Sequence, residues 1–334
     1  MYINILIIIL VNIFFIYFFS SFAKKIGLVD FPDKRKLHKG FIPLVGGITI
    51  YSSMFVFYFL IDISMWQNII IFSSLILLII GIIDDMKELG VLERFFFQIL
   101  SCLIVIGFGI TIVDFDNLFK INILTEELVI LFTFLCVIGL TNAINFIDGI
   151  DGLAAGIILN ALISILIFSY LDNNTQDLDF VFLLIFSLVI FLFSNLGILL
   201  PKIFLGDSGS TALGFLLGFL LVYYTHPNIR NFHPVLTIWC VAIPTYDFMS
   251  VFIRRILKGI NPFKPDRRHL HHLLISKGFN QINVSFIMIS ASFLLSMFGF
   301  SIYKFYNPLY SLVVFFFVFI LFLLISIYIS RLED

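Results

Sequence analysis

Residues 67–85 read QNIIIFSSLILLIIGIIDD, an almost unbroken apolar run that ends in two adjacent aspartates. A helix of about 20 mostly apolar residues is long enough to cross the hydrocarbon core of a bilayer. The run is continuously apolar, whereas the strands of a membrane barrel alternate in hydrophobicity. The stretch therefore predicts a membrane-spanning helix with a pair of carboxylates at its end.

The rest of the chain has the same character. Of its 334 residues, 61% are hydrophobic and 12% are charged, whereas a soluble domain is about 45–50% apolar and about 25% charged. We therefore expect an all-α, polytopic integral membrane protein, with residues 1–334 forming a single domain of about eleven transmembrane helices. The predicted spans are 2–22, 46–61, 67–83, 95–113, 127–141, 153–171, 179–197, 210–225, 234–253, 281–303 and 308–330.

The charged residues predict the orientation of these spans. Seventeen of the 20 Lys and Arg residues fall on one set of alternate loops, and three fall on the other: Lys120, Arg230 and Lys304. Because positively charged loops stay in the cytoplasm, we expect the N-terminus outside and the C-terminus inside. The net charge of -1 also argues against a nucleic-acid partner, which would require a basic face.

Polar residues gather in the five predicted cytoplasmic loops, 23–45, 84–94, 142–153, 198–210 and 254–280. Carboxylates beside membrane helices are costly, about 2.5–3.5 kcal/mol at the bilayer centre and less at its edge. Because basic residues are scarce near the third and fourth loops, we expect a divalent cation, Mg²⁺ or alternatively Mn²⁺, held with substrate phosphates. Taken singly, each acid has the alternative of being a solvated loop residue. The acids are Asp84, Asp85, Asp148, Asp151 and Asp207.

Two of these loops have organised patterns. Residues 142–153 read NAINFIDGIDGL, which on a helix places its Asn and Asp side chains on roughly one face. Residues 206–210 read GDSGS and open the next span, where a helix N-terminus can bind an anion. The alternative for the second pattern is an ordinary helix start.

A histidine cluster lies in the last large loop. His269, His271 and His272 follow Arg268, a combination that suits a phosphate-rich substrate. Zinc is the rival ligand, but no cysteine or second histidine cluster has the spacing of zinc ligands.

Asp247 lies inside the predicted ninth span. An acid within the membrane is a functional candidate. The interpretation that we favour from sequence is an ion pair with Arg254 or Arg255.

Taken together and in order, these motifs resemble the polyprenyl-phosphate N-acetylhexosamine-1-phosphate transferase superfamily (glycosyltransferase family 4). The resemblance covers nearly the whole chain. It includes the paired aspartates, the Asn/Asp/Gly stretch, the Gly-Asp-Ser-Gly-Ser turn, the His-x-His-His string, and in the first loop Arg35-Lys36-x-His38 and Pro43-x-x-Gly46-Gly47.

The resemblance implies a reaction and its partners. A sugar 1-phosphate passes from a UDP-N-acetylhexosamine to undecaprenyl phosphate, a lipid of the bacterial inner membrane, and UMP is released. The active site would face the cytoplasm, the product would start a cell-surface polysaccharide, and relatives suggest a homodimer.

The resemblance also implies residue roles. Asp207, with Asp148, would bind Mg²⁺, and Asp84 or Asp85 would deprotonate or orient the lipid phosphate, with a covalent aspartyl-phosphate as the alternative. His271 would assist catalysis. The other implied substrate contacts are Lys36, His38, Asn145, Asp148, Asp151, Asn195 (for uridine), Arg268, His269 and His272.

The string His269-Leu270-His271-His272 is closer to the N-acetylglucosamine branch than to phospho-MurNAc-pentapeptide translocase, which has three consecutive histidines. We therefore expect UDP-N-acetylglucosamine as donor, with other UDP-N-acetylhexosamines or UDP-MurNAc-pentapeptide as alternatives. A transporter is the rival from another class. Transporters usually place their polar site near the bilayer midplane between repeats, whereas these acids gather at one face.

Overall fold

The structure, a computed structural model, describes residues 2–31, 40–112, 125–261 and 269–331. These residues form thirteen helices and one antiparallel pair of two-residue strands, β1 (Val29–Asp30) and β2 (Ile42–Pro43). The helices are α1 (Tyr2–Ile26), α2 (Gly46–Phe57), α3 (Met65–Lys87), α4 (Val91–Gly107), α5 (Glu126–Ile147), α6 (Leu153–Leu171), α7 (Asp179–Asn195), α8 (Gly206–Thr225), α9 (Val235–Cys240), α10 (Ala242–Leu257), α11 (Leu270–Ser276), α12 (Gln281–Phe305) and α13 (Pro308–Arg331).

The all-α, polytopic prediction is confirmed. Seven helices are long and apolar enough to cross a membrane: α1, α3, α5, α6, α8, α12 and α13. The other predicted spans coincide with shorter helices, α2, α4, α7 and the α9–α10 pair. The number of eleven crossings and the sides on which the termini lie stay predictions.

The prediction of one span over 234–253 needs a correction, because the chain there forms two helices and not one. The first helix, α9, ends at Cys240, and Val241 has φ −122° and ψ 27°, outside helical values. Pro244 explains the break, since a proline ring clashes with the carbonyl four residues earlier, which here belongs to Cys240. In the first turn of α10 the same proline is tolerated.

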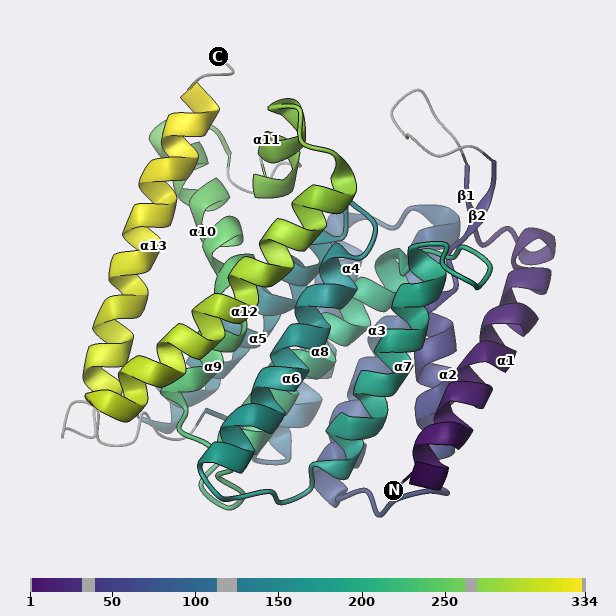
Figure 1. The fold of residues 1–334 in the computed structure, drawn as a ribbon, viewed down its shortest axis with the longest axis horizontal. Helices are drawn as coiled ribbons and strands as arrows, with labels where there is room; N and C mark the ends of the chain where they lie inside the picture. The colour runs from purple at the N-terminus through teal and green to yellow at the C-terminus, as the bar shows by residue number, and fades with distance from the viewer. Residues whose placement is uncertain (1, 32–39, 113–124, 262–268, 332–334) are drawn as a thin grey trace.

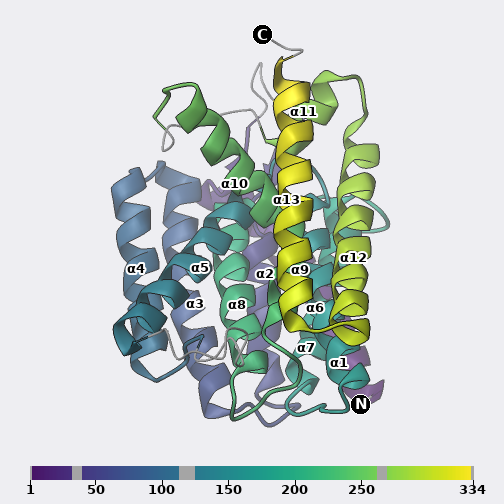
Figure 2. The same ribbon diagram turned by 90° about the vertical axis from the view of Figure 1, so that its left-hand side faces the viewer.

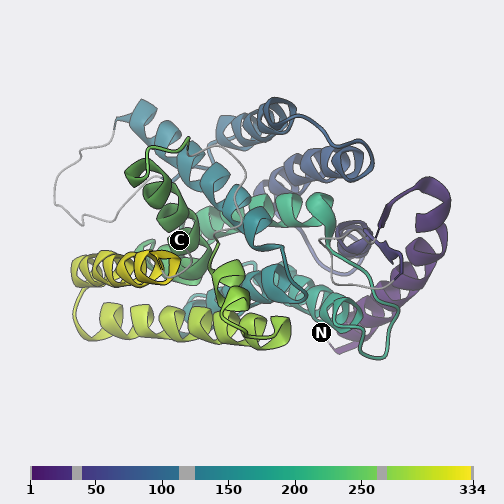
Figure 3. The ribbon, with the colours of Figure 1, turned by 90° about the horizontal axis from the view of Figure 1, so that it is seen from above.

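The helices form one bundle around α8. Nearly every residue of α8 is buried, and α2, α3, α5 and α6 all pack against it. The first helix, α1, and the last, α13, lie at opposite edges of the bundle, as Figures 1 and 3 show. Both edge helices expose many large apolar side chains, as expected of helices that contact lipid.

Glycines allow α8 to touch its neighbours backbone to backbone. A Cβ atom at Gly81 of α3 would lie 2.3 Å from Cα of Ser208, and one at Gly47 of α2 would lie 2.5 Å from Cα of Gly209. Small residues commonly allow this close approach in membrane helices. The N–H group of Gly46 also donates to the carbonyl of Phe204 at 2.9 Å. The start of α8 is therefore fixed by both α2 and α3.

We predict that Gly81→Ala destabilises the protein, because the added methyl group meets backbone that cannot rotate away. Such overpacking costs roughly 1–3 kcal/mol. The matched control is Gly139→Ala in α5, where a Cβ atom would meet nothing within 4 Å. Thermal unfolding in detergent should show a lower Tm for Gly81→Ala alone. Equal Tm values for the two variants would contradict the close packing of α3 and α8.

Candidate active site

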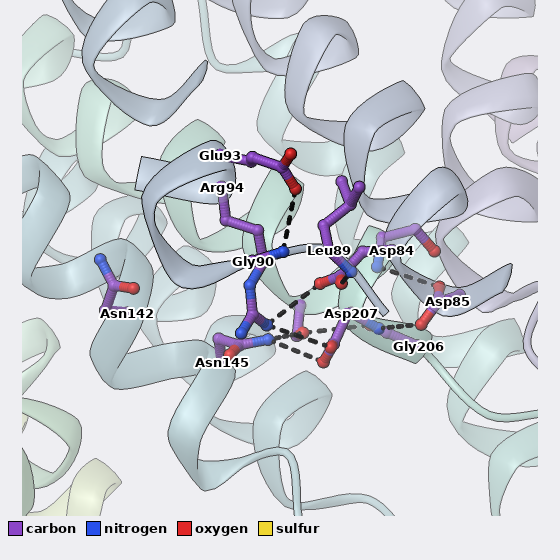
Figure 4. A network of polar contacts seen from close by, with 12 residues as sticks. Asp84, Asp85, Leu89, Gly90, Glu93, Arg94, Asn142, Asn145, Gly206 and Asp207 are labelled. Atoms are coloured by element: carbon purple, nitrogen blue, oxygen red, sulfur yellow. Dashed lines mark hydrogen bonds and ion pairs between the residues drawn. The ribbon is translucent and has the colours of Figure 1, made fainter. Parts of the chain in front are cut away.

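The carboxylate of Asp85, near the end of α3, caps the start of α8 (Figure 4). Its two oxygens accept the backbone N–H groups of Asp207 at 2.9 Å and Ser208 at 3.2 Å. Gly206 makes room for this contact: it has φ +77°, and a Cβ atom there would lie 2.7 Å from Asp85 Oδ2. The sequence predicts an anion site at this helix start. In the structure the carboxylate of Asp85 occupies these two N–H groups.

Asp84 organises the turn between α3 and α4. Its Oδ1 accepts the N–H of Leu89 at 2.7 Å, and its Oδ2 pairs with Arg94 Nη1 at 3.0 Å. The same Arg94 nitrogen lies 3.7 Å from Asp207 Oδ2. The Asp84 side chain is only 5% exposed. Asp84 therefore holds the guanidinium of Arg94 beside Asp207.

Arg94 is the main site residue that sequence reasoning missed. The sequence accounts for it as one of the basic residues that hold a loop in the cytoplasm, although it lies ten positions from Asp84, at the start of the next helix. That proximity to the paired acids was the available signal.

Asn145, in the last turn of α5, fixes the other side of Asp207. Its Nδ2 donates to Asp207 Oδ1 at 3.1 Å and to Ser210 Oγ at 2.9 Å. The Asp207 side chain is nevertheless 47% exposed. Residues from three separate loops thus converge on one accessible carboxylate.

Asp148 adds a further acid to this group. It follows α5 directly, is half-buried, and in the described part of the chain its side chain makes no hydrogen bond or ion pair. Burial raises the pKa of Asp148 well above its usual range, and the charges of Asp207, Asp85 and Asp151 raise it further. The site therefore gathers more carboxyl groups than can easily ionise together, and Arg94 offsets their charge only in part.

An excess of carboxyl groups over basic side chains is what a site for a divalent cation requires. Among the described residues, no three His, Cys, Asp or Glu side chains gather as a complete metal site. Mg²⁺, however, usually binds through one or two carboxylates, with substrate phosphates and water completing its shell. Both oxygens of Asp85 accept backbone N–H groups, and those of Asp84 bond to the N–H of Leu89 and to Arg94. Asp207 and Asp148 are therefore the two carboxylates that fit this role.

Asn195, Asp151 and Lys202 hold two of the loops together. Asn195 Oδ1 accepts the N–H of Gly152 at 2.6 Å, and its Nδ2 donates to the carbonyl of Ile203 at 2.9 Å. Lys202 forms an ion pair with Asp151. Sequence resemblance assigned Asn195 to uridine and Asp151 to the nucleotide. In the structure both side chains link the 142–153 loop to the segment before α8.

Among the described residues, Asp247 contacts the histidine segment rather than Arg254 or Arg255. Its Oδ2 lies 2.8 Å from Nδ1 of His269, and its Oδ1 accepts the N–H of Leu270 at 2.7 Å. These contacts replace the ion pair with Arg254 or Arg255 that we favoured from sequence. The ring of His269 in turn lies 5.5 Å from that of Phe146, at the end of α5.

His271 is fully buried, and neither ring nitrogen has a hydrogen-bond partner in the described residues. Burial, with a smaller effect of the neighbouring His272, lowers its pKa to about 3, so the ring is neutral near pH 7. Its Nε2 packs on Gly149, where a Cβ atom would lie 2.6 Å away. His272 is half-buried with its ring 4.1 Å from that of His271. The predicted contacts Lys36, His38 and Arg268 lie outside the described residues.

We predict that Asn195→Ala destabilises the protein in the absence of any nucleotide. The substitution leaves a backbone N–H and a backbone carbonyl without partners, which costs roughly 1–3 kcal/mol. Asn228→Ala is the control, since that asparagine is exposed at the opposite end of α8. A Tm of Asn195→Ala equal to that of the wild type would contradict the linking role and favour a nucleotide contact alone.

Comparison with known proteins connects this site to a family. Residues 67–225, from α3 to the end of α8, match the sequence profile of glycosyl transferase family 4. A relative from Escherichia coli O157:H7, named undecaprenyl-phosphate alpha-N-acetylglucosaminyl 1-phosphate transferase, is 33% identical over 297 residues, which cover 85% of this chain and 79% of the relative. Relatives of the same name from Escherichia coli K12 and Yersinia pestis are both 32% identical, over 85% of this chain and 79% and 80% of their own lengths. The matched profile includes every labelled residue of Figure 4.

Proposed function

The chain belongs to glycosyl transferase family 4, and we propose that it transfers N-acetylglucosamine 1-phosphate from UDP-N-acetylglucosamine to undecaprenyl phosphate. The acceptor and the transferred group are those in the names of the relatives. The single observation that carries the proposal is the exposed carboxylate of Asp207, held between Asn145 and Arg94 in an acid-rich site. Such a site suits a cation together with a diphosphate.

The bond changes of this reaction are simple. An oxygen of undecaprenyl phosphate attacks the phosphorus that carries the sugar, and the bond from that phosphorus to the oxygen bridging to UMP breaks. UMP leaves with that oxygen, and the lipid product is a diphosphate. Because the reacting groups are anionic, catalysis depends mainly on positioning and on neutralising charge.

The residues of the site match these needs. The Arg94 guanidinium is 38% exposed and has N–H groups beyond the one on Asp84, so it can donate to phosphate oxygens. Asp207 and Asp148 would hold Mg²⁺, which when bound neutralises charge on the diphosphate. Asn145 keeps Asp207 in one orientation.

The contacts of the paired aspartates support direct attack by the lipid phosphate. A covalent aspartyl-phosphate needs a carboxylate oxygen that is free to attack. Both oxygens of Asp85 accept backbone N–H groups, and those of Asp84 bond to Leu89 and Arg94. We therefore assign positioning roles to Asp84 and Asp85.

The proposed location is the cytoplasmic face of the bacterial inner membrane, with eleven crossings. The site lies where α3 and α5 end and α8 begins. The last turn of α13 lies at that same end of the bundle, and the first turn of α1 lies at the other end (Figures 1 and 2). The distribution of basic residues supports a cytoplasmic position for this end. There a soluble nucleotide sugar and a membrane lipid can meet.

We predict that purified protein in detergent transfers radiolabel from UDP-N-acetylglucosamine to undecaprenyl phosphate, and that EDTA abolishes the transfer. Asp207→Asn should lower kcat by about 100-fold or more, as expected when a preorganised electrostatic group is removed. Asp62→Asn, an exposed acid before α3 at the opposite end of the bundle, is the control and should keep wild-type activity.

If the protein releases UMP from another UDP-sugar but transfers nothing from UDP-N-acetylglucosamine, the proposed identity of the donor is wrong. If folded protein shows no activity with any UDP-sugar of a panel, the proposed function is overturned. Full activity in EDTA would contradict the role given to a divalent cation.

A further inference from the structure

We propose that Asp247 is a positioning residue that acts through His269 to place the histidine segment (residues 269–272) against the 142–153 loop, which carries the proposed cation ligand Asp148. This inference rests on the proposed function, and it adds a residue outside the 67–225 profile match. The observation behind it is the buried carboxylate of Asp247, whose two oxygens both have partners and which has no part in the proposed reaction described above.

Asp247 bonds to two consecutive residues of the histidine segment. One oxygen meets Nδ1 of His269 and the other accepts the N–H of Leu270, the first residue of α11. The side chain of Asp247 is 1% exposed and that of His269 is 9% exposed. Because a buried carboxylate without partners is strongly destabilising, these two contacts lock the start of α11 onto α10.

The contact also determines where the proton of His269 lies. A carboxylate can only accept, so Nδ1 of His269 must carry hydrogen, and Nε2 is the ring nitrogen left for a ligand. The partner of one imidazole nitrogen commonly fixes the role of the other in this way. Asp247 thus sets both the position and the tautomer of His269.

The helix that carries Asp247 is itself firmly placed. The hydroxyl of Tyr246 donates to the carbonyl of Phe315 in α13 at 2.8 Å, and the Tyr246 ring packs among aromatic side chains of that helix. Asp247 is therefore a rigid anchor.

From this anchor the histidine segment reaches the 142–153 loop at two points. The ring of His269 lies against Phe146, and the ring of His271 lies against Gly149. Asp148, a proposed cation ligand, stands between these two contact points in the sequence. His271, whose ring nitrogens have no partner in the described residues, is thereby held against Gly149, the residue after Asp148. Without the contact between Asp247 and His269, the histidine segment should no longer hold the 142–153 loop in place. The donor should then bind more weakly.

The experiment compares Asp247→Asn, His269→Gln and the double variant, with KM measured separately for UDP-N-acetylglucosamine and undecaprenyl phosphate. Each single change should raise the donor KM by about 10- to 100-fold, the range for a hydrogen bond to a charged group. The double variant should be no worse than the single ones, because both remove one interaction. The KM for undecaprenyl phosphate should stay within about twofold of the wild-type value, which is well below the change of tenfold or more expected for the donor KM.

The matched control is Ser250→Ala. Its hydroxyl donates to the backbone carbonyl of Asp247 at 2.9 Å and leaves the carboxylate untouched, so the donor KM should not change. If Asp247→Asn does not fold, His269→Gln removes the same contact from the other partner.

A second readout does not need turnover. In ¹⁵N spectra of protein with labelled histidines, one ring should be protonated at Nδ1 in the wild type and lose that signature in both single variants. Unchanged spectra, or an unchanged donor KM in an active enzyme, would overturn the role of Asp247 and leave the proposed function standing. An inactive wild type with the Nδ1 signature intact would instead count against the proposed function.

Discussion

The carboxylate of Asp85 on the first N–H groups of α8 is the contact on which the candidate site depends. The first N–H groups of a helix have no partner within the helix, and in a buried position they must find one. Asp85 supplies it from α3, 122 residues earlier in the chain. Gly81 and Gly206 make the contact possible, because a side chain at either position would push α3 and α8 apart.

Once the start of α8 is fixed, the rest of the site follows from it. Asp207 is the second residue of α8, so its side chain leaves the helix at a defined point. Asn145 reaches Asp207 from α5, and Arg94 reaches it from α4 by way of Asp84. Each of these contacts satisfies one side chain with another and leaves part of the Asp207 carboxylate accessible. Acids outnumber the bases that contact them here, which is the electrostatic basis for assigning a cation and a diphosphate to the site.

The helical character of the chain could be predicted from sequence because a bilayer demands it. Backbone groups in hydrocarbon must bond within the segment, so long apolar runs become helices. The gathering of Asp84, Asp85 and Asp207 at one end of the bundle also followed from the alternation of spans. The break at Val241 was missed because the run is apolar throughout, although Pro244 marked it.

The partners of individual side chains could not be predicted in the same way. Asn195 bonds to a residue 43 positions away, and Asp247 to one 22 positions away. Motif spacing reports which residues share a helix face and carries no information on such tertiary contacts. Asn195 and Asp247 therefore received roles from resemblance or local charge, and the structure shows contacts that organise the loops. Arg94 was overlooked because a basic residue beside a membrane helix already had a sufficient explanation.

We propose that Asp207 and Asp148 bind a divalent cation together with the diphosphate of the donor. Electron paramagnetic resonance of Mn²⁺, titrated into detergent-purified protein with and without UDP-N-acetylglucosamine, tests it most directly. We expect a single Mn²⁺ site whose affinity rises when the nucleotide sugar is present, and a loss of affinity of about tenfold or more in Asp207→Asn and in Asp148→Asn. Equal Mn²⁺ affinity in the wild type and both variants would contradict it.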